Sequence, residues 1–287
     1  MQIKNIPRNI PRYTRKAMLW RRNSHPFLSG DLFSDQADVS FFSPKFRRSQ
    51  PKIREIAQAK VIFCPSHDLE KMLDEYGQYI NAKVLILGNS DRDFDSFEFR
   101  VPSSIKRILA QNLSVADSRS LVLPIGIENL RLATNGLPNL FTKEMVSRTK
   151  EKKVLVGPLG ITHPERLDLY QHIQEPDDVF EIKKDRLTPM EYANFSSNFR
   201  FIASPRGNGL DTHRFWETLY RGSHPLVLDS SWARSMEAYG IPLIRLSNWS
   251  RIEVEFAINA PRFSSYYPAQ SEAIWWPYWR KIISETL

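Results

Sequence analysis

Short apolar runs alternate with amphipathic segments along the chain. In the first half, the runs 61–65, 83–89 and 120–126 have the length and composition of buried strands. The segment 68–80 has the spacing of an amphipathic helix, and 104–112 is also predicted to be helical. Strands that alternate with helices are typical of an α/β protein with parallel sheets.

The second half repeats this alternation after a polar, irregular stretch at 131–150, which we interpret as a linker. Thr188 and Glu191 form a predicted capping box, with Pro189 at the first helical position. The other predicted strands are 153–157, 179–182, 199–203, 225–228 and 242–246, and the other predicted helices are 164–172, 212–220, 232–239 (capped by Ser231) and 249–259.

The segment 204–217 joins a predicted strand to a predicted helix through a loop with two glycines. Gly207 and Gly209 would let backbone N–H groups approach a ligand closely. A helix N-terminus favours negative charge through its unpaired N–H groups and its dipole. Cationic or donor side chains come from Arg206, His213 and Arg214. The sequence therefore predicts a diphosphate cradle at this loop.

The helix behind the loop carries further polar residues. Asp211 is expected to cap its N-terminus, with the helix beginning at Thr212. His213, Arg214 and Glu217 then form one polar stripe, and Glu217 is placed to accept hydrogen bonds from ribose hydroxyls. The alternative is that Arg214 and Glu217 form an ordinary surface ion pair.

Ligands of parallel α/β sheets bind outside the carboxyl ends of the strands. Polar or glycine-containing motifs follow four of the predicted strands: Asn89–Asp91, Gly126–Glu128, Gly157–Gly160 and Arg206–Asp211. We expect these motifs to line a common binding region.

The chain has 287 residues, enough for two modest domains or one large one. The single cysteine, Cys64, excludes an internal disulfide and a cysteine-based zinc cluster, and it fits a reducing compartment. No apolar run approaches the ~18 residues of a transmembrane helix. The first residues lack the apolar core of a signal peptide. We therefore expect a cytoplasmic protein.

Positive charge is concentrated near the N-terminus. Residues 1–60 hold 13 Lys and Arg against 4 Asp and Glu, whereas the remainder is close to neutral. Tyr13 and Trp20 lie among the basic residues. Three interpretations of this arm are open: it packs on the first domain, it contacts an anionic membrane surface, or it binds nucleic acid. We expect packing first, peripheral contact at the inner face of the membrane second, and no nucleic-acid partner.

Residues 204–225 resemble the C-terminal signature of exostosin-like and related bacterial GT-B glycosyltransferases, SPRGNGxDTHRFWExLxxGxxP between two strands. The first half is similar to bacterial surface-polysaccharide transferases in its motif order: Asn-Ser-Asp at 89–91, Ala-Gln-Asn at 110–112 and Pro-Ile-Gly-Ile-Glu-Asn at 124–129. The resemblance covers residues 60–250.

This resemblance implies a GT-B fold, an α/β architecture in which two Rossmann-like domains with parallel sheets face a central cleft. The expected parts are a basic arm over 1–60 partly packed on the first domain, an acceptor domain over 61–145, a nucleotide-sugar-binding domain over 146–262, and an aromatic segment over 263–287 that crosses back to the first domain. The alternative for the aromatic segment is a membrane-interface anchor, because tryptophans favour that depth.

The implied nucleotide-sugar site consists of Ser204, Arg206, Gly207, Asn208, Gly209, Asp211, Thr212, His213, Arg214 and Glu217. Inverting transfer also needs a base for the acceptor hydroxyl and positive charge for the leaving diphosphate. The candidates for the base are Asp91, then His67, then Glu128. The alternative for Glu128 is a hydrogen-bonding residue that orients the hinge.

The function predicted from these features is transfer of a sugar from a nucleotide-diphosphate donor to a glycan or other hydroxyl acceptor, in surface polysaccharide synthesis. No cofactor is expected and a divalent metal is dispensable, although Asp91-Arg92-Asp93 matches a metal-binding DxD pattern. Gly207 and Gly209 resemble the first half of the dinucleotide-binding fingerprint of nicotinamide dehydrogenases. The third glycine of that fingerprint would stand at position 212, which is Thr212, so this enzyme class is disfavoured. The alternative function is a non-catalytic module that binds nucleotides, or nucleic acid through the basic arm.

Overall fold

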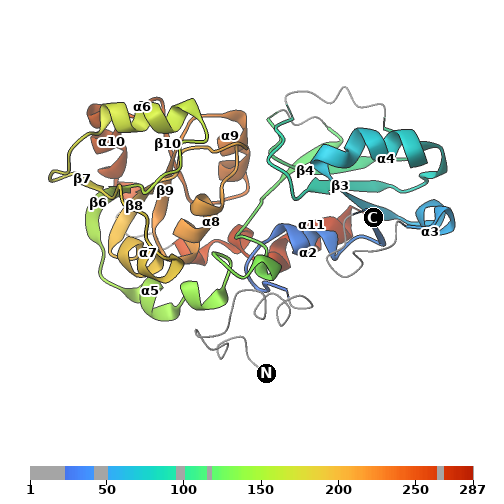
Figure 1. The fold of residues 1–287 in the computed structure, drawn as a ribbon, viewed down its shortest axis with the longest axis horizontal. Coiled ribbons are helices and arrows are strands. Elements are labelled where there is room, and N and C mark those ends of the chain that lie inside the picture. The colour runs from blue at the N-terminus through green and yellow to red at the C-terminus, as the bar shows by residue number, and fades with distance from the viewer. Residues whose placement is uncertain (1–22, 42–50, 95–100, 115–117, 264–267, 287) are drawn as a thin grey trace. The chain divides into compact units, whose positions relative to one another are not determined.

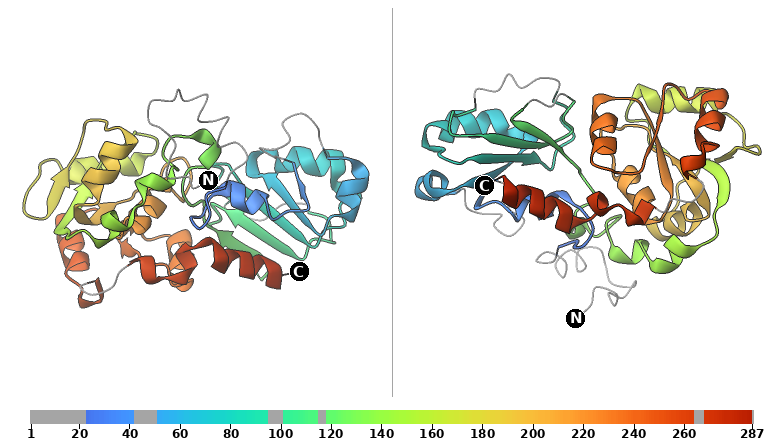
Figure 2. Two further views of the ribbon diagram at one scale, coloured as in Figure 1. Left: turned by 90° about the horizontal axis from the view of Figure 1, so that it is seen from below. Right: turned by 180° about the vertical axis from the view of Figure 1, so that it is seen from behind.

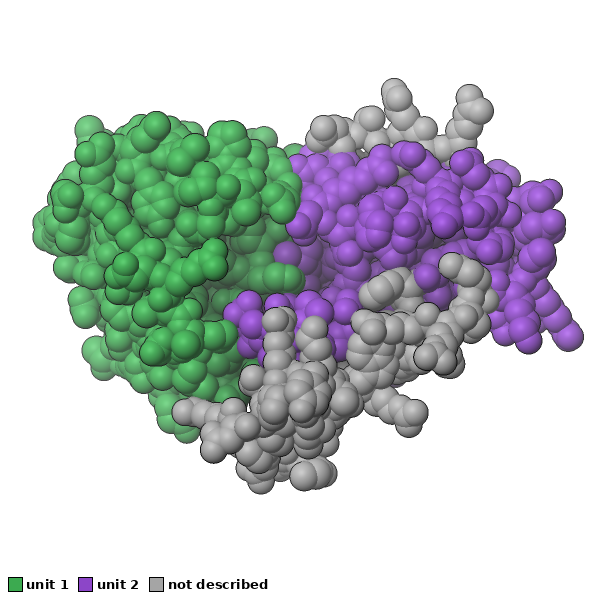
Figure 3. Space-filling model, in the orientation of Figure 1, with its two compact units in different colours: residues 1–5, 137–274 green, residues 6–136, 275–287 purple. Residues whose placement is uncertain are grey.

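The computed structural model describes residues 23–41, 51–94, 101–114, 118–263 and 268–286. Its contacts divide the chain into two compact units (Figure 1, Figure 3). Unit 1 comprises residues 1–5 and 137–274, and unit 2 comprises residues 6–136 and 275–287. Residues 1–22 and 42–50 of the basic arm predicted over 1–60 lie outside the described residues.

Unit 2 contains a parallel sheet of five strands that follow one another in sequence order, β1-β2-β3-β4-β5. The strands are β1 (Val39–Ser40), β2 (Val61–Pro65), β3 (Val84–Gly88), β4 (Arg107–Gln111) and β5 (Ser120–Leu123). The helices of this unit include α2 (Gly30–Ser34), α3 (Ile53–Gln58), α4 (Leu69–Tyr76) and α11 (Trp276–Glu285). The strands predicted in the first half are confirmed to within a few residues.

The predicted helix over 104–112 is wrong, because Arg107–Gln111 forms the strand β4. Its Cα atoms pair in parallel register with both β3 and β5, so β4 is an interior strand. Four consecutive residues from Ile108 to Gln111 are buried. A strand covered on both faces loses the alternation of polar and apolar residues, and its sequence then resembles a buried helix.

Unit 1 contains a second parallel sheet of five strands, in the order β10-β9-β8-β6-β7. The strands are β6 (Glu151–Val156), β7 (Phe180–Ile182), β8 (Phe199–Ala203), β9 (His224–Leu228) and β10 (Ile244–Leu246). The chain places β7 on one side of β6 and then builds β8, β9 and β10 on the other side. The direction of strand addition therefore reverses between β6 and β8.

Helices cover both faces of the unit 1 sheet. They are α5 (Lys143–Ser147), α6 (Pro164–His172), α7 (Pro189–Ser196), α8 (His213–Tyr220), α9 (Ser231–Ala238) and α10 (Arg251–Ile258). Residues of α6 and α10 share one apolar cluster with the strands, whereas Tyr192 and Phe195 of α7 pack on a separate cluster around Leu155. This arrangement, with two parallel sheets among the described residues, confirms the α/β class.

The ends of the unit 1 helices follow the sequence signals closely. Thr188 caps α7 in a capping box with Glu191, as predicted. The predicted cap of α9 is wrong by one residue. Ser230 rather than Ser231 is the N-cap, and its hydroxyl accepts a hydrogen bond from the Ala233 N–H at 3.1 Å.

The C-terminal residues 275–287 belong to unit 2 (Figure 2). Trp276 and Trp279 of α11 are buried, at 4% and 0% exposure. The Trp276 ring meets the edge of Phe33 with centroids 5.2 Å apart, and its main-chain N–H donates to Pro26. These tryptophans therefore serve as core residues of unit 2. Within the described ranges, no helix combines the length and apolar character that crossing a bilayer requires.

Candidate functional site

The reversal of strand order in unit 1 marks where a ligand is expected to bind. Counted from β6, the strands of this sheet run 5-4-3-1-2 across it, the order of flavodoxin-like doubly wound sheets. In such sheets the ligand crevice lies outside the carboxyl ends of the strands at the reversal. The two loops at this position are 157–163 after β6 and 204–212 after β8. The predicted diphosphate loop is one of them.

The loop 204–212 is fixed at both ends. The buried Ser204 continues the ladder of β8, since its N–H donates to Leu226 O at 2.8 Å. Asp211, only 4% exposed, accepts from the indole N–H of Trp216 through both carboxylate oxygens, at 2.8 and 3.0 Å. Asp211 is therefore not the helix cap. The N-cap is Thr212 and the helix begins at His213, because the carboxylate is committed to the buried indole.

Thr212 has an unusual environment for an N-cap residue. Its backbone is extended, with φ −132° and ψ 144°, yet its side chain makes no capping hydrogen bond. The hydroxyl oxygen is buried and has no hydrogen-bond partner among the described residues. Thr212 thus does not supply the side-chain acceptor that an N-cap residue usually gives to the first turn of its helix. An anionic oxygen at this position would satisfy both the hydroxyl and the helix end.

The guanidinium of Arg214 binds the loop 157–163, which follows β6. It donates to Gly157 O at 3.2 Å and to Pro158 O at 2.5 Å. It also donates to the Tyr192 hydroxyl at 2.6 Å and lies 4.8 Å from the centre of that ring. These bonds to main-chain carbonyls position the loop after β6. Arg214 is half-buried, and its remaining N–H groups are available to a ligand.

The predicted polar stripe continues into the interior of unit 1 and not along its surface. Glu217 is 8% exposed and pairs with Arg221 at 3.4 Å, so its ion-pair partner is Arg221 and not Arg214 as in the alternative. Arg221 also donates to Leu140 O and lies 5.0 Å from the centre of the Phe141 ring. The pair with Arg221 uses Oε2 of the Glu217 carboxylate.

The remaining predicted residues lie in the loop 204–212 and at the start of α8. Asn208 and His213 are exposed, and His213 is the first residue of α8. Arg206 donates to Asn208 O at 3.3 Å. The Gly207 N–H donates to Gly209 O at 3.2 Å, so this amide is used within the loop and does not point freely at a ligand.

Two site residues carry no signal in the sequence, Glu165 and Arg166 in the first turn of α6. Arg166 donates from Nε to Arg206 O and from Nη1 to Gly160 O, both at 2.8 Å. Burial, together with the positive charge of Arg214, lowers the pKa of Arg166, and Glu165 opposes this shift. Burial likewise raises the pKa of Glu165, although the Arg206 main chain donates to its carboxylate. Both residues precede the loop they hold by about forty positions, a separation that local patterns do not reveal.

The three candidate bases lie in unit 2 after different strands. His67 follows β2 and is well exposed, with Nε2 at 3.5 Å from Asp68 Oδ2. Asp91 follows β3 and is exposed. Glu128 follows β5, and its Oε2 accepts from the N–H groups of Asn135 at 2.7 Å and Gly136 at 3.4 Å. These two hydrogen bonds hold the turn at Asn135 and Gly136.

The N-terminal motifs are joined by amide side chains at the carboxyl ends of β3, β4 and β5. Gln111 accepts from the Asn89 N–H at 2.8 Å and donates to Pro124 O at 2.9 Å. Asn129 donates to the Asn89 side chain at 2.9 Å. Gly126 has a φ of +68°, and a Cβ there would lie 2.1 Å from Leu28 O. The motifs therefore have a structural role that their order in the sequence did not indicate.

One buried carboxylate belongs to the same network and was not predicted. Asp31 of α2 accepts from Arg131 Nε at 2.9 Å, and its N–H donates to Asn129 at 2.8 Å. Burial raises the pKa of Asp31, although Arg131 opposes this shift. Asp31 and Arg131 lie one hundred residues apart, so their pairing depends on the tertiary fold.

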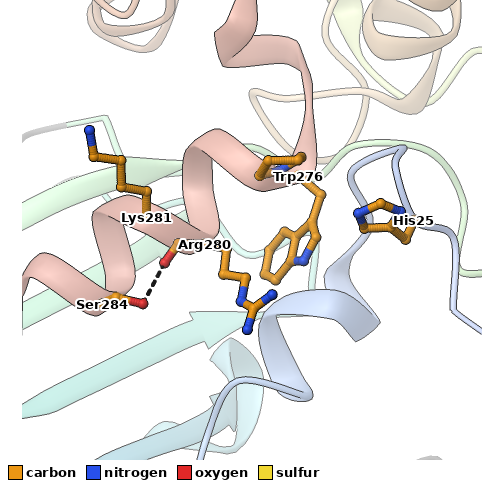
Figure 4. A pocket seen from close by; sticks show the side chains of 6 residues that line it. His25, Trp276, Arg280, Lys281 and Ser284 are labelled. Carbon is orange, nitrogen blue, oxygen red and sulfur yellow. Dashed lines mark hydrogen bonds between the residues drawn. The ribbon is translucent and has the colours of Figure 1, made fainter.

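A pocket of about 380 Å³ lies elsewhere in unit 2, between α11 and the turn at His25 (Figure 4). Its lining residues are His25, Trp276, Pro277, Arg280, Lys281 and Ser284. Arg280 and Lys281 point in different directions from α11, so their charges do not converge on one position. The residues predicted from the sequence to bind or react with a ligand lie outside this pocket.

Comparison with models of protein families and with curated proteins gives no match. Among the residues that the structure describes, no three His, Cys, Asp or Glu side chains form a group that could hold a metal ion.

Proposed function

We propose that this chain is a glycosyltransferase of GT-B type that moves a sugar from a nucleotide-diphosphate donor to a glycan or other hydroxyl acceptor. The observation that carries the proposal is the place of the loop 204–212, at the strand-order reversal of a parallel sheet and directly before α8. The orphaned hydroxyl of Thr212 and the helix end behind it suit an anion.

In this proposal, unit 1 binds the diphosphate of the donor. Departure of the nucleotide leaves negative charge on that diphosphate, and preorganised donors and cations stabilise it. The groups in place are the α8 N-terminus, the Thr212 hydroxyl and the guanidinium of Arg214, with Arg206 and His213 at the rim. Ser204 and Asp211 hold the loop in shape, and no step requires a metal.

The base for the acceptor hydroxyl is proposed to come from unit 2. Asp91 remains the first candidate, because it is exposed and follows a strand end. His67 is second, and Glu128 is third because its carboxylate already accepts from two main-chain N–H groups. The GT-B arrangement, the polysaccharide acceptor and peripheral contact with a membrane at its inner face belong to the proposal as well.

The first experiment is a thermal-shift and calorimetric screen of UDP, GDP, CDP and ADP and of their sugar conjugates. A ligand that binds only the folded state raises the unfolding temperature. We expect one nucleoside diphosphate to bind, and Arg214→Ala to weaken that binding. Binding only to RNA or DNA, with a steep salt dependence, would favour the non-catalytic module instead.

A second experiment tests the base. Asp91→Asn keeps the size of the side chain and removes its basicity, so donor binding should persist while sugar transfer is lost. His67→Gln is the matched variant for the second candidate. Normal turnover in Asp91→Asn would remove Asp91 from the mechanism and leave the donor site unaffected.

A further inference from the structure

Arg166 holds the two loops of the crevice together. Its Nε donates to Arg206 O and its Nη1 to Gly160 O, each at 2.8 Å, so it bridges the loops after β8 and β6. Glu165, the preceding residue, accepts from the main chain of Arg206. The first turn of α6 thus holds both polar backbone groups of Arg206.

The third nitrogen of Arg166 has no such partner. Nη2 makes no hydrogen bond to a described residue. It lies beside Gly207, where an added Cβ would come within 2.9 Å of Nη2 and 3.4 Å of Thr162 Oγ1. The glycine of the loop therefore provides the space that this end of the guanidinium occupies.

Positive charge gathers around this point. Arg214 is close enough to disfavour the charged form of Arg166, and Glu165 is the nearby acid that opposes this effect. Glu165 is itself engaged with the Arg206 main chain. Two guanidinium groups from different helices thus border the crevice, each fixed by backbone carbonyls and each with donors left over. An anion with two charged groups fits this arrangement better than one with a single charge.

We infer that Arg166 is a second phosphate-binding residue of this site: Nη2 donates to an oxygen of the diphosphate while Nε and Nη1 keep the two loops at the spacing the ligand needs. This inference rests on the proposed function and adds a residue on α6 to the binding site. Arg166 and Arg214 then hold the diphosphate from two helices, α6 and α8.

The test is calorimetric titration of the full chain with inorganic pyrophosphate and with UDP, GDP, CDP and ADP. We expect Arg166→Met to raise the Kd of whichever of these probes bind by about tenfold to a hundredfold, the range for a hydrogen bond to a charged group. Arg251→Met is the matched control, because Arg251 pairs with Asp177 and Asp178 ahead of β7. It should change the Kd by less than about twofold.

Gly207→Ala tests the same geometry without removing the arginine. The added methyl group displaces Nη2, so binding should weaken, whereas Gly77→Ala has open space around its Cβ and should bind normally. The unfolding midpoint of each variant without ligand separates loss of affinity from loss of fold. If Arg166→Met does not fold, Arg166→Lys replaces it, since a single ammonium group cannot bond both loops and the ligand.

The outcomes distinguish this inference from the proposal on which it rests. If the wild-type chain binds none of the five probes, both are wrong. If it binds one of them and the folded Arg166 variant has the wild-type Kd, Arg166 is only a structural residue and the donor site stands. Weaker binding in both the Arg166 and Gly207 variants, with normal binding in the two controls, supports the inference.

Discussion

At the start of α8, the hydroxyl of Thr212 is buried without a hydrogen-bond partner among the described residues. An orphaned buried polar group lowers stability by about 1–3 kcal/mol. We therefore expect Thr212→Val to leave the free energy of unfolding unchanged or higher, and to weaken binding of a nucleoside diphosphate about tenfold. Chemical denaturation and calorimetry measure the two quantities.

Thr212→Ser keeps the hydroxyl and is the control for this change. It should bind the nucleotide like the wild-type chain. A Thr212→Val protein that loses stability but binds normally would show that the hydroxyl has a structural partner and no role toward an anion.

At the scale of elements, α8 packs a charged pair into unit 1. Removing Glu217 leaves Arg221 buried without its partner, and breaking a buried pair in this way costs about 3 kcal/mol. We expect Glu217→Ala to lower the free energy of unfolding by roughly that amount. The exposed pair Lys281–Glu285 has the same i,i+4 spacing, so Glu285→Ala is the control and should cost less than about 0.5 kcal/mol.

This comparison also decides between two roles of Glu217. A ribose-binding carboxylate would lose affinity for the nucleotide on substitution and leave the ligand-free stability unchanged. Unchanged stability in Glu217→Ala would therefore contradict the packing described here and favour the role expected from the sequence.

Lys150, a half-buried lysine directly before β6, has a disfavoured charge. Burial, with the nearby charges of Arg148 and Arg221, lowers the pKa of Lys150 to about 8. Between this value and its ordinary pKa near 10.5, the unfolded chain holds a proton that the folded chain has released. The contribution of Lys150 to the free energy of unfolding therefore rises as the pH increases from about 8 to 10.5. Below pH 8 the lysine is charged in the folded chain, and the full cost of burying that charge lowers the stability.

We expect the free energy of unfolding of the wild-type chain to rise relative to that of Lys150→Met as the pH increases from 8 to 10.5. Denaturation at several pH values measures it. Lys152→Met, at an exposed neighbouring position, controls for the general effect of pH. A difference that stays constant with pH would contradict the lowered pKa.

The elements could be predicted from the sequence where burial leaves a local pattern. Buried parallel strands such as β2 and β3 are unbroken apolar runs, and the capping box at Thr188 is a short-range signal. The strand β4 was missed because a doubly covered strand and a buried helix have similar sequences. The predicted cap of α8 is wrong by one residue because Trp216, five positions after Asp211, donates to the Asp211 carboxylate.

The composition of the site was only partly predictable for the same reason. The loop 204–212 is continuous in sequence, so its glycines and cationic side chains are recognisable there. Arg166 and the pair Asp31–Arg131 reach their partners across long separations, and only the fold brings them together. Glu217 is the opposite case. Its spacing from Arg214 predicts a ligand-binding carboxylate, and only the fold reveals its ion pair with Arg221.

At the scale of the whole molecule, the two sheets differ in one respect that matters for function. Both are parallel and have five strands, but only the unit 1 sheet reverses its strand order among the described residues. The rule for ligand crevices in such sheets therefore points to unit 1. The net charge of +8 does not by itself explain an anion site there, since the excess lies in residues 1–60.

The crevice between the loops 157–163 and 204–212 is tested most directly by a crystal structure with a bound nucleoside diphosphate. Crystals of the full chain soaked with UDP, GDP or CDP should show the two phosphate groups over the first turn of α8, within hydrogen-bond distance of the Thr212 hydroxyl. A nucleotide that binds elsewhere on the protein, with this crevice empty, would contradict the assignment.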